Sequence, residues 1–221
     1  NSSSNNTGAS NNQNTSNILD KTYKLKENYF KFDLSNATYT GKPIKPTVTT
    51  DLDKKYYSIE YENNVDVGTA TIVITGNLNY TGTIKKKFKI IPCVINNDLF
   101  RVDTSDKFYA NGKIMPNVSS RLIVDDDYSI EYENNVDVGT ATIIIKGKGN
   151  YTGTISFNFI IIAKPLNKGM FEINLDAVTY NGKAQEKAID TDLKYNEDYT
   201  VQYLNNVDVG TATVTIKGKG N

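Results

Sequence analysis

The chain of 221 residues contains no histidine and no tryptophan, and Cys93 is its only cysteine. A disulfide within the chain is therefore impossible, and a Cys/His zinc site cannot be assembled. A cysteine nucleophile would also lack the histidine that usually activates it. We interpret Cys93 as a small, half-buried residue between two modules, and we expect no cofactor.

The chain also lacks an excess of charge of either sign, because 25 lysines and arginines balance 25 acidic residues. A nucleic-acid or polybasic membrane binder would carry a positive excess. No apolar run approaches the roughly 20 residues that span a bilayer. We therefore expect no nucleic-acid partner and no membrane insertion. The ends carry no signal peptide and no sorting motif, so we expect a piece of a longer protein whose adjacent domains are its partners.

One stretch is present three times. The nine letters NNVDVGTAT stand at Asn63–Thr71, Asn134–Thr142 and Asn205–Thr213, so the sequence repeats with a period of 71. An alternating run of apolar and polar residues precedes and follows each copy, and two such runs around a polar loop predict a β-hairpin. A fixed period of this length indicates tandem modules in place of one large core.

Comparison of the copies predicts which side chains face the core. In the third copy Ala212, Val214 and Ile216 alternate with threonines, and the period of two places the apolar set inward. The same rule makes Tyr57, Ile59 and Tyr61 core residues, and likewise Tyr128, Ile130 and Tyr132 in the second copy. A return strand follows in the first two copies, at 83–90 and 154–161.

The third copy stops at Asn221, before the segment that would correspond to Tyr151–Ile161. That segment would form its last strand. We therefore predict that the third module has an exposed sheet edge or an open core.

The modules divide the chain into an Asn/Ser-rich disordered linker at 1–24 and repeats at 25–92, 93–163 and 164–221, the last incomplete. Each repeat offers about five to six short strands and no helical periodicity, which favours an all-β fold of small two-layer β-sandwiches. Prolines before the second strand indicate that it lies at a sheet edge or starts there. One extra residue before Gly112 predicts a bulge in the second repeat. Short junctions that carry a proline favour a semi-rigid string of modules.

The order of motifs resembles the bacterial Ig-like (MBG/Big-type) repeats of low-GC Gram-positive cell-surface proteins. In the first repeat the matching segments are Tyr39–Lys42, Tyr57–Tyr61, Asn63–Gly76, Asn79–Thr83 and Phe88–Ile90, and the second repeat has their counterparts. Leu78 stands where the family has glycine, and residues 184–188 lack its proline. The resemblance implies Ig-like modules that are secreted, wall- or surface-associated, and used as spacers or adhesive stalks.

Several polar groups are candidates for sites. Asp66, Asp137 and Asp208 lie beside paired asparagines, but one aspartate with two amides is a poor calcium ligand set, and these residues also form turns. Loop or solvent-exposed strand positions likewise account for Asp125–Asp127 and Lys85–Lys87. Lysines recur after the turn glycine, yet no inward carboxylate accompanies them to support an isopeptide bond. The lysines that recur after the turn glycine are Lys42, Lys113 and Lys183. We therefore assign no catalytic, cofactor-binding or metal residues.

Three functions from different classes follow. The first is a non-catalytic spacer or stalk of an extracellular, cell-surface or wall-associated protein. The second is an adhesin module that binds cell-wall glycan, host glycan or a host protein through exposed loops, for which Tyr80 and Tyr151 are the aromatic candidates. The third is an enzyme, which we do not expect, because no acidic pair suited to glycoside hydrolysis recurs.

Overall fold

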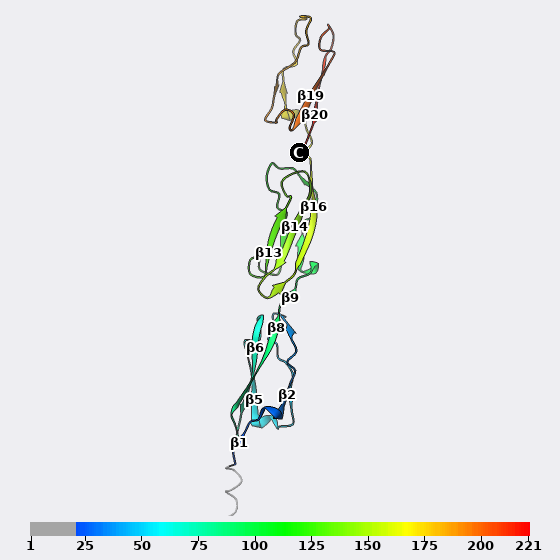
Figure 1. Ribbon diagram of the computed structural model, residues 1–221. Coiled ribbons are helices and arrows are strands. Elements are labelled where there is room, and N and C mark those ends of the chain that lie inside the picture. The colour runs from blue at the N-terminus through cyan, green and yellow to red at the C-terminus, as the bar shows by residue number, and fades with distance from the viewer. Residues whose placement is uncertain (1–20) are drawn as a thin grey trace, which may run out of the picture. The chain divides into compact units, whose positions relative to one another are not determined.

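The computed structural model describes residues 21–221, and the protein is all-β (Figure 1). The helices of this part of the chain are four 3-10 turns, Glu27–Tyr29 (η1), Lys54–Tyr56 (η2), Asn97–Leu99 (η3) and Lys168–Met170 (η4). None of them is long and apolar enough to cross a membrane. The predicted linker lies outside the described residues up to position 20, but its last two residues, Tyr23–Lys24, form strand β1.

The chain folds as two compact units. The first holds the described residues through Val94 together with Gly149–Thr152, and the second holds Ile95–Lys148 and Gly153–Asn221. A short turn from the second sequence repeat thus belongs to the first unit.

The main sheet of the first unit has four strands in the order β3-β8-β6-β5. Its centre is the predicted hairpin, in which Tyr57–Glu62 (β5) pairs antiparallel with Gly68–Gly76 (β6). The return strand Thr83–Ile91 (β8) pairs along the other edge of β6. A short strand, Ala37–Thr38 (β3), runs parallel to the end of β8.

Three two-stranded pairs complete this unit. Phe30–Phe32 (β2) pairs antiparallel with Val48–Thr50 (β4), which places the proline-led strand at an edge as predicted. The other two pairs are parallel and only two residues long. They join β1 to Tyr80–Thr81 (β7), and Cys93–Val94 (β9) to Tyr151–Thr152 (β15).

The core of the first unit follows the alternation of β6. Ala70, Ile72 and Ile74 are fully buried. They pack in one cluster with Phe88 and Ile90 of the return strand and with residues before β2. The predicted inward face is therefore confirmed for β6, whereas Tyr57, Ile59 and Tyr61 of β5 are half-buried and pack against this cluster. Val73, on the opposite face, is also buried, between Glu60 and Lys85 in register.

Two turns have a non-glycine residue in the left-handed region. Leu78 adopts a left-handed φ of 54°, close to the 59° of Gly149 at the same place in the next repeat, so the substituted residue keeps the turn conformation of glycine. In the second repeat the extra residue makes no bulge in a strand. Instead Asn111 takes a φ of 56° in a bend, where the first repeat uses Gly41 at 74°. Asparagine tolerates this region better than most residues.

The second unit contains a four-stranded sheet in the order β11-β16-β14-β13. Its strands are Lys107–Phe108, Thr154–Ile162, Gly139–Gly147 and Tyr128–Glu133. Phe100–Val102 (β10) pairs with Val118–Ser120 (β12). The fully buried residues repeat those of the first unit and are Ala141, Ile143, Ile145 and Ile161, with Phe159 almost as well covered.

The third repeat lies in the same unit and is less covered. Glu172–Ile173 (β17) pairs with Ile189–Asp190 (β18), and Tyr199–Leu204 (β19) pairs with Thr213–Gly218 (β20). In the described chain the other edge of β20 has no strand beside it. Ala212 is exposed, and Val214 and Ile216 are only half-buried. They border open clefts of about 540 and 590 Å³, so the predicted open core is confirmed.

Candidate functional site

The loop shared by the three repeats has one backbone conformation. Its first asparagine is left-handed in every copy, with φ of 54° at Asn63, 53° at Asn134 and 54° at Asn205. Its glycine also has a positive φ, from 139° to 148°. Asn and Gly are the residues that enter this region at least cost, which explains why the loop uses them at these two positions.

The second asparagine holds the loop to the chain after the Gly-Lys turn. Its Nδ2 donates to the carbonyl oxygen of Ile44 at 2.8 Å, of Ile114 at 2.9 Å and of Gln185 at 3.0 Å in the three repeats. The N–H groups of the same three residues donate back to the asparagine carbonyls, all at 2.7 Å. These asparagines are Asn64, Asn135 and Asn206. Each joins two segments of its repeat that are 20 or 21 residues apart in the sequence.

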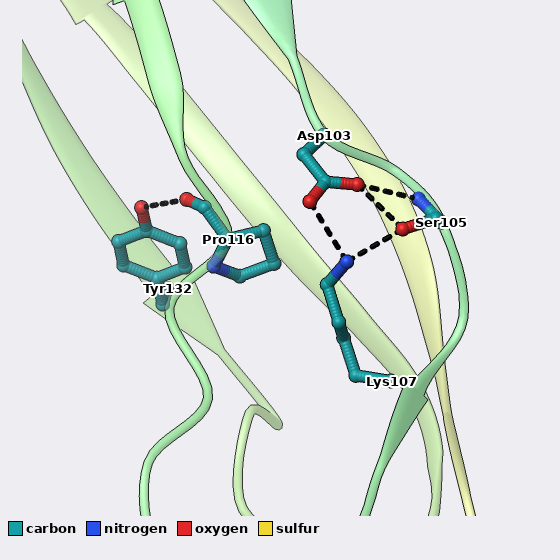
Figure 2. Close-up of polar contacts among 5 residues, drawn as sticks. All are labelled: Asp103, Ser105, Lys107, Pro116 and Tyr132. Carbon is teal, nitrogen blue, oxygen red and sulfur yellow. Dashed lines mark hydrogen bonds and ion pairs between the residues drawn. The ribbon is translucent and has the colours of Figure 1, made fainter.

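A tyrosine of the hairpin makes a similar tie. Tyr61 Oη donates to the carbonyl oxygen of Pro46 at 3.0 Å, and Tyr132 donates to Pro116 at 2.8 Å (Figure 2). Tyr203 repeats the bond at 2.8 Å to Lys187. Burial raises the pKa of Tyr61 and Tyr132, so both remain protonated donors at neutral pH. The recurrent polar groups of the hairpin hold backbone in place.

The aspartates of the shared loop are exposed and do not converge with other acids. No group of three or more acidic, cysteine or histidine residues is placed to hold a metal within residues 21–221. In the acidic run, Asp127 accepts the N–H of Ile123 at 2.9 Å, and Asp198 accepts that of Lys194 at 2.8 Å in the third repeat. These two carboxylates stabilise turns, whereas the predicted turn formers Asp66 and Asp137 accept a side-chain amide of another repeat.

The recurring lysines do not support an internal covalent bond. Lys42, Lys113 and Lys183 are all exposed, whereas an isopeptide bond requires a buried lysine beside a carboxylate. Lys85 and Lys87 on β8 are exposed as well, and Lys85 pairs with Glu62 across the sheet at 3.5 Å.

The two tyrosines considered for glycan binding are packed against other rings. The ring centroid of Tyr80 lies 5.3 Å from that of Tyr23 and 5.1 Å from that of Tyr56. The rings of Tyr151 and Tyr39 pack edge to face, with their centroids 5.5 Å apart. Both are half-buried. The more exposed rings belong instead to Phe108, Tyr180 and Tyr195, with 57% to 59% of their surface accessible.

A polar cluster around Asp103 was not predicted from the sequence. Asp103 Oδ1 accepts the hydroxyl and N–H of Ser105 at 2.6 and 3.0 Å, and its Oδ2 accepts Lys107 Nζ at 2.8 Å (Figure 2). Lys107 Nζ also donates to Ser105 Oγ at 2.5 Å. The first repeat has the Asp33–Ser35 turn without the lysine. The signal in the sequence was an Asp-x-Ser turn followed two residues later by a cation.

This cluster predicts a pH effect. Lys107, then Ser105, lowers the pKa of Asp103 to about 2. Because the folded pKa lies below the unfolded value of about 3.9, the stabilisation is present above pH ~4 and is lost as the pH falls toward 2. Lys107→Ala should raise the pKa of Asp103, leaving the smaller depression caused by Ser105. NMR titration of the carboxyl carbon measures it, with Asp33 as the unchanged reference. An unchanged pKa of Asp103 would exclude Lys107 as the cause.

Comparison with models of protein families, with curated proteins and with solved structures yields no match to this chain.

Proposed function

We propose that the chain consists of small Ig-like β-sandwich modules that act as a non-catalytic spacer or stalk of an extracellular, cell-surface protein. In this role the modules present an adjacent domain or support adhesion. The modules contribute to this role through the length of their folded segments.

One observation carries the proposal: two polar residues that recur in all three repeats are occupied in holding backbone. The second loop asparagine ties two segments together, and the hairpin tyrosine ties β5 or its equivalent to the chain before the second strand. The recurring apolar residues of β6 and β14 are fully buried. These recurring contacts maintain the fold of each module, which is what a spacer requires.

The extracellular location is supported by composition and by the resemblance. The segment at 1–17 contains only Asn, Ser, Thr, Gly, Ala and Gln, as expected for a tether between domains. The order of motifs in the repeats is similar to that of Gram-positive surface modules. A location at the cell wall would place an adjacent domain at a distance set by the number of modules.

The test compares spacing with binding in one protein. The chain is displayed on a Gram-positive cell through a fused wall anchor, with an epitope at its outer end, and versions with one repeat fewer are displayed beside it. We expect antibody access to the epitope to fall with each module removed, and to be restored by unrelated Ig-like modules of equal number. A failure of this substitution would count against the spacer role.

The purified chain is also applied to glycan and extracellular-matrix arrays. Absence of saturable binding agrees with a spacer. Saturable binding that is lost in Tyr180→Ala, a substitution at an exposed ring, would favour the adhesin alternative instead.

A further inference from the structure

In the second unit, the side chain of Asn221 is bound by the shared loop of repeat 2. Its Oδ1 accepts the N–H of Val138 at 3.1 Å, and its Nδ2 donates to Asp137 Oδ1 at 3.2 Å. Asn221 lies in the Gly-Asn turn of the third repeat, 83 residues after Val138. The Asp-Val pair of one repeat thus receives the asparagine of the next.

The first unit contains the same arrangement at the same sequence separation. Asn150 Oδ1 accepts the N–H of Val67 at 2.8 Å, and its Nδ2 donates to Asp66 Oδ1 at 3.0 Å. The ring of Tyr151, the next residue, packs on Tyr39. Because the same contact is present in both places, it is a property of the repeat.

The chemistry of the contact selects asparagine. A carboxamide carries an acceptor and a donor on one planar group, and the loop offers a donor, the valine N–H, next to an acceptor, the aspartate carboxylate. In the reverse orientation, the amide NH₂ would face the valine N–H and the amide oxygen would face the aspartate carboxylate. Donor would then oppose donor, and acceptor would oppose acceptor. Aspartate in its place would bring a second carboxylate toward Asp66 or Asp137. The charged acceptor also makes this bond stronger than one between neutral groups.

The asparagine is also held by a backbone bond within its own module. The carbonyl oxygen of Asn150 accepts the N–H of Cys93 at 3.0 Å, and that of Asn221 accepts Lys164 at 3.0 Å. The first repeat has the same backbone bond, from Tyr23 to Asn79 at 2.7 Å. However, Asn79 Oδ1 is buried and has no partner among the described residues. The turn is therefore preformed, and in repeat 1 its amide oxygen is left without a hydrogen bond.

In repeat 3, the loop that corresponds to the asparagine-binding loops of repeats 1 and 2 binds no asparagine within the described residues. Neither the Val209 N–H nor the Asp208 carboxylate has a hydrogen-bond partner within the described chain, and Val209 is 87% exposed, compared with 41% for Val138. Tyr180, the counterpart of Tyr39, is 57% exposed. The loop keeps the conformation that binds asparagine in the other two repeats.

We propose that the Asp208–Val209 loop is a binding site for the asparagine turn of a further module of this repeat. The aspartate and the valine N–H hold the carboxamide, and the tyrosine supplies a ring against the residue after it. The inference goes beyond the spacer role and does not depend on it, because adhesive modules in series would need the same joint.

The test lengthens the chain by one period. A copy of residues 151–221 is added after Asn221, so that the new copy of Asn221 stands 83 residues after Val209, the separation found twice already. The matched control has alanine in place of that new asparagine. Both proteins gain the missing strand of repeat 3, so they differ only in the carboxamide.

Amide hydrogen exchange by NMR reports the result. Exchange at Val209 should be roughly fivefold to tenfold slower with asparagine than with alanine, the equilibrium effect of about one hydrogen bond. Val138 should exchange alike in both proteins, and protected amides in β20 verify that repeat 3 is folded. Asp208→Ala in the asparagine version should remove most of the difference. Equal exchange at Val209 in the folded pair overturns the proposal.

Discussion

Ile145→Ala is expected to lower the free energy of unfolding of repeat 2 by about 3 to 4 kcal/mol, near the middle of the range for emptying a buried isoleucine position. Ile145 is fully buried on β14, and its counterpart Ile74 is fully buried on β6. Removing three methyl or methylene carbons there loses transfer free energy and leaves a cavity that the sheet cannot close. Ile74→Ala should therefore cost repeat 1 a similar amount.

The chain provides its own matched control at Ile216, which occupies the same place in repeat 3. That side chain is half-buried and borders an open cleft, so Ile216→Ala leaves no enclosed cavity and should cost about 1 kcal/mol or less. Native-state hydrogen exchange in β6, β14 and β20 reads the three local stabilities separately. Equal losses at all three positions would contradict the open core of repeat 3.

The second large effect is expected from adding the missing strand alone. A chain extended by a copy of residues 151–161 should gain on the order of 5 kcal/mol of local stability in repeat 3, from two or three apolar side chains that become buried. In repeat 2 the equivalent strand β16 pairs with Gly139–Lys146 of β14 and places Phe159 and Ile161 in the core. The same pairing would cover Val214 and Ile216.

Thermal unfolding and hydrogen exchange in β19 and β20 measure this gain. The control extension has serine in place of the copies of Phe159 and Ile161, which keeps the backbone bonds but removes the apolar contacts. It should recover less than half of the stabilisation. If both extensions protect β20 equally, the stabilisation comes from backbone pairing and not from closure of the core.

The hairpins and their inward faces could be predicted because they depend on the alternation of apolar and polar residues over a few positions. The three copies show this alternation at corresponding positions. Ala70, Ile72 and Ile74 show this well, since each has a counterpart in β14 and in β20 or just before it. The period of two is a direct geometric property of a strand, so the pattern needs no knowledge of distant contacts.

Other features could not be predicted because they join residues far apart without a periodic signal. The parallel pairs β1–β7 and β9–β15 are two residues long, too short for any alternation. The bonds of Asn150 to Asp66 and Val67 connect different repeats, and asparagine in a turn already has a local explanation. Lys107 occurs in one repeat only, so comparison of copies could not identify it.

The spacing of the asparagine contact has a genetic consequence. Val67 and Asn150 are 83 residues apart, as are Val138 and Asn221, so the contact reaches from one repeat into the next and recurs with the period of the sequence. Recombination between misaligned copies removes or inserts whole periods. After loss of one period, the former Asn221 would stand 83 residues after Val67, as Asn150 did before the loss. The array can therefore lengthen or shorten between generations without any compensating substitution, and each new junction inherits a working contact.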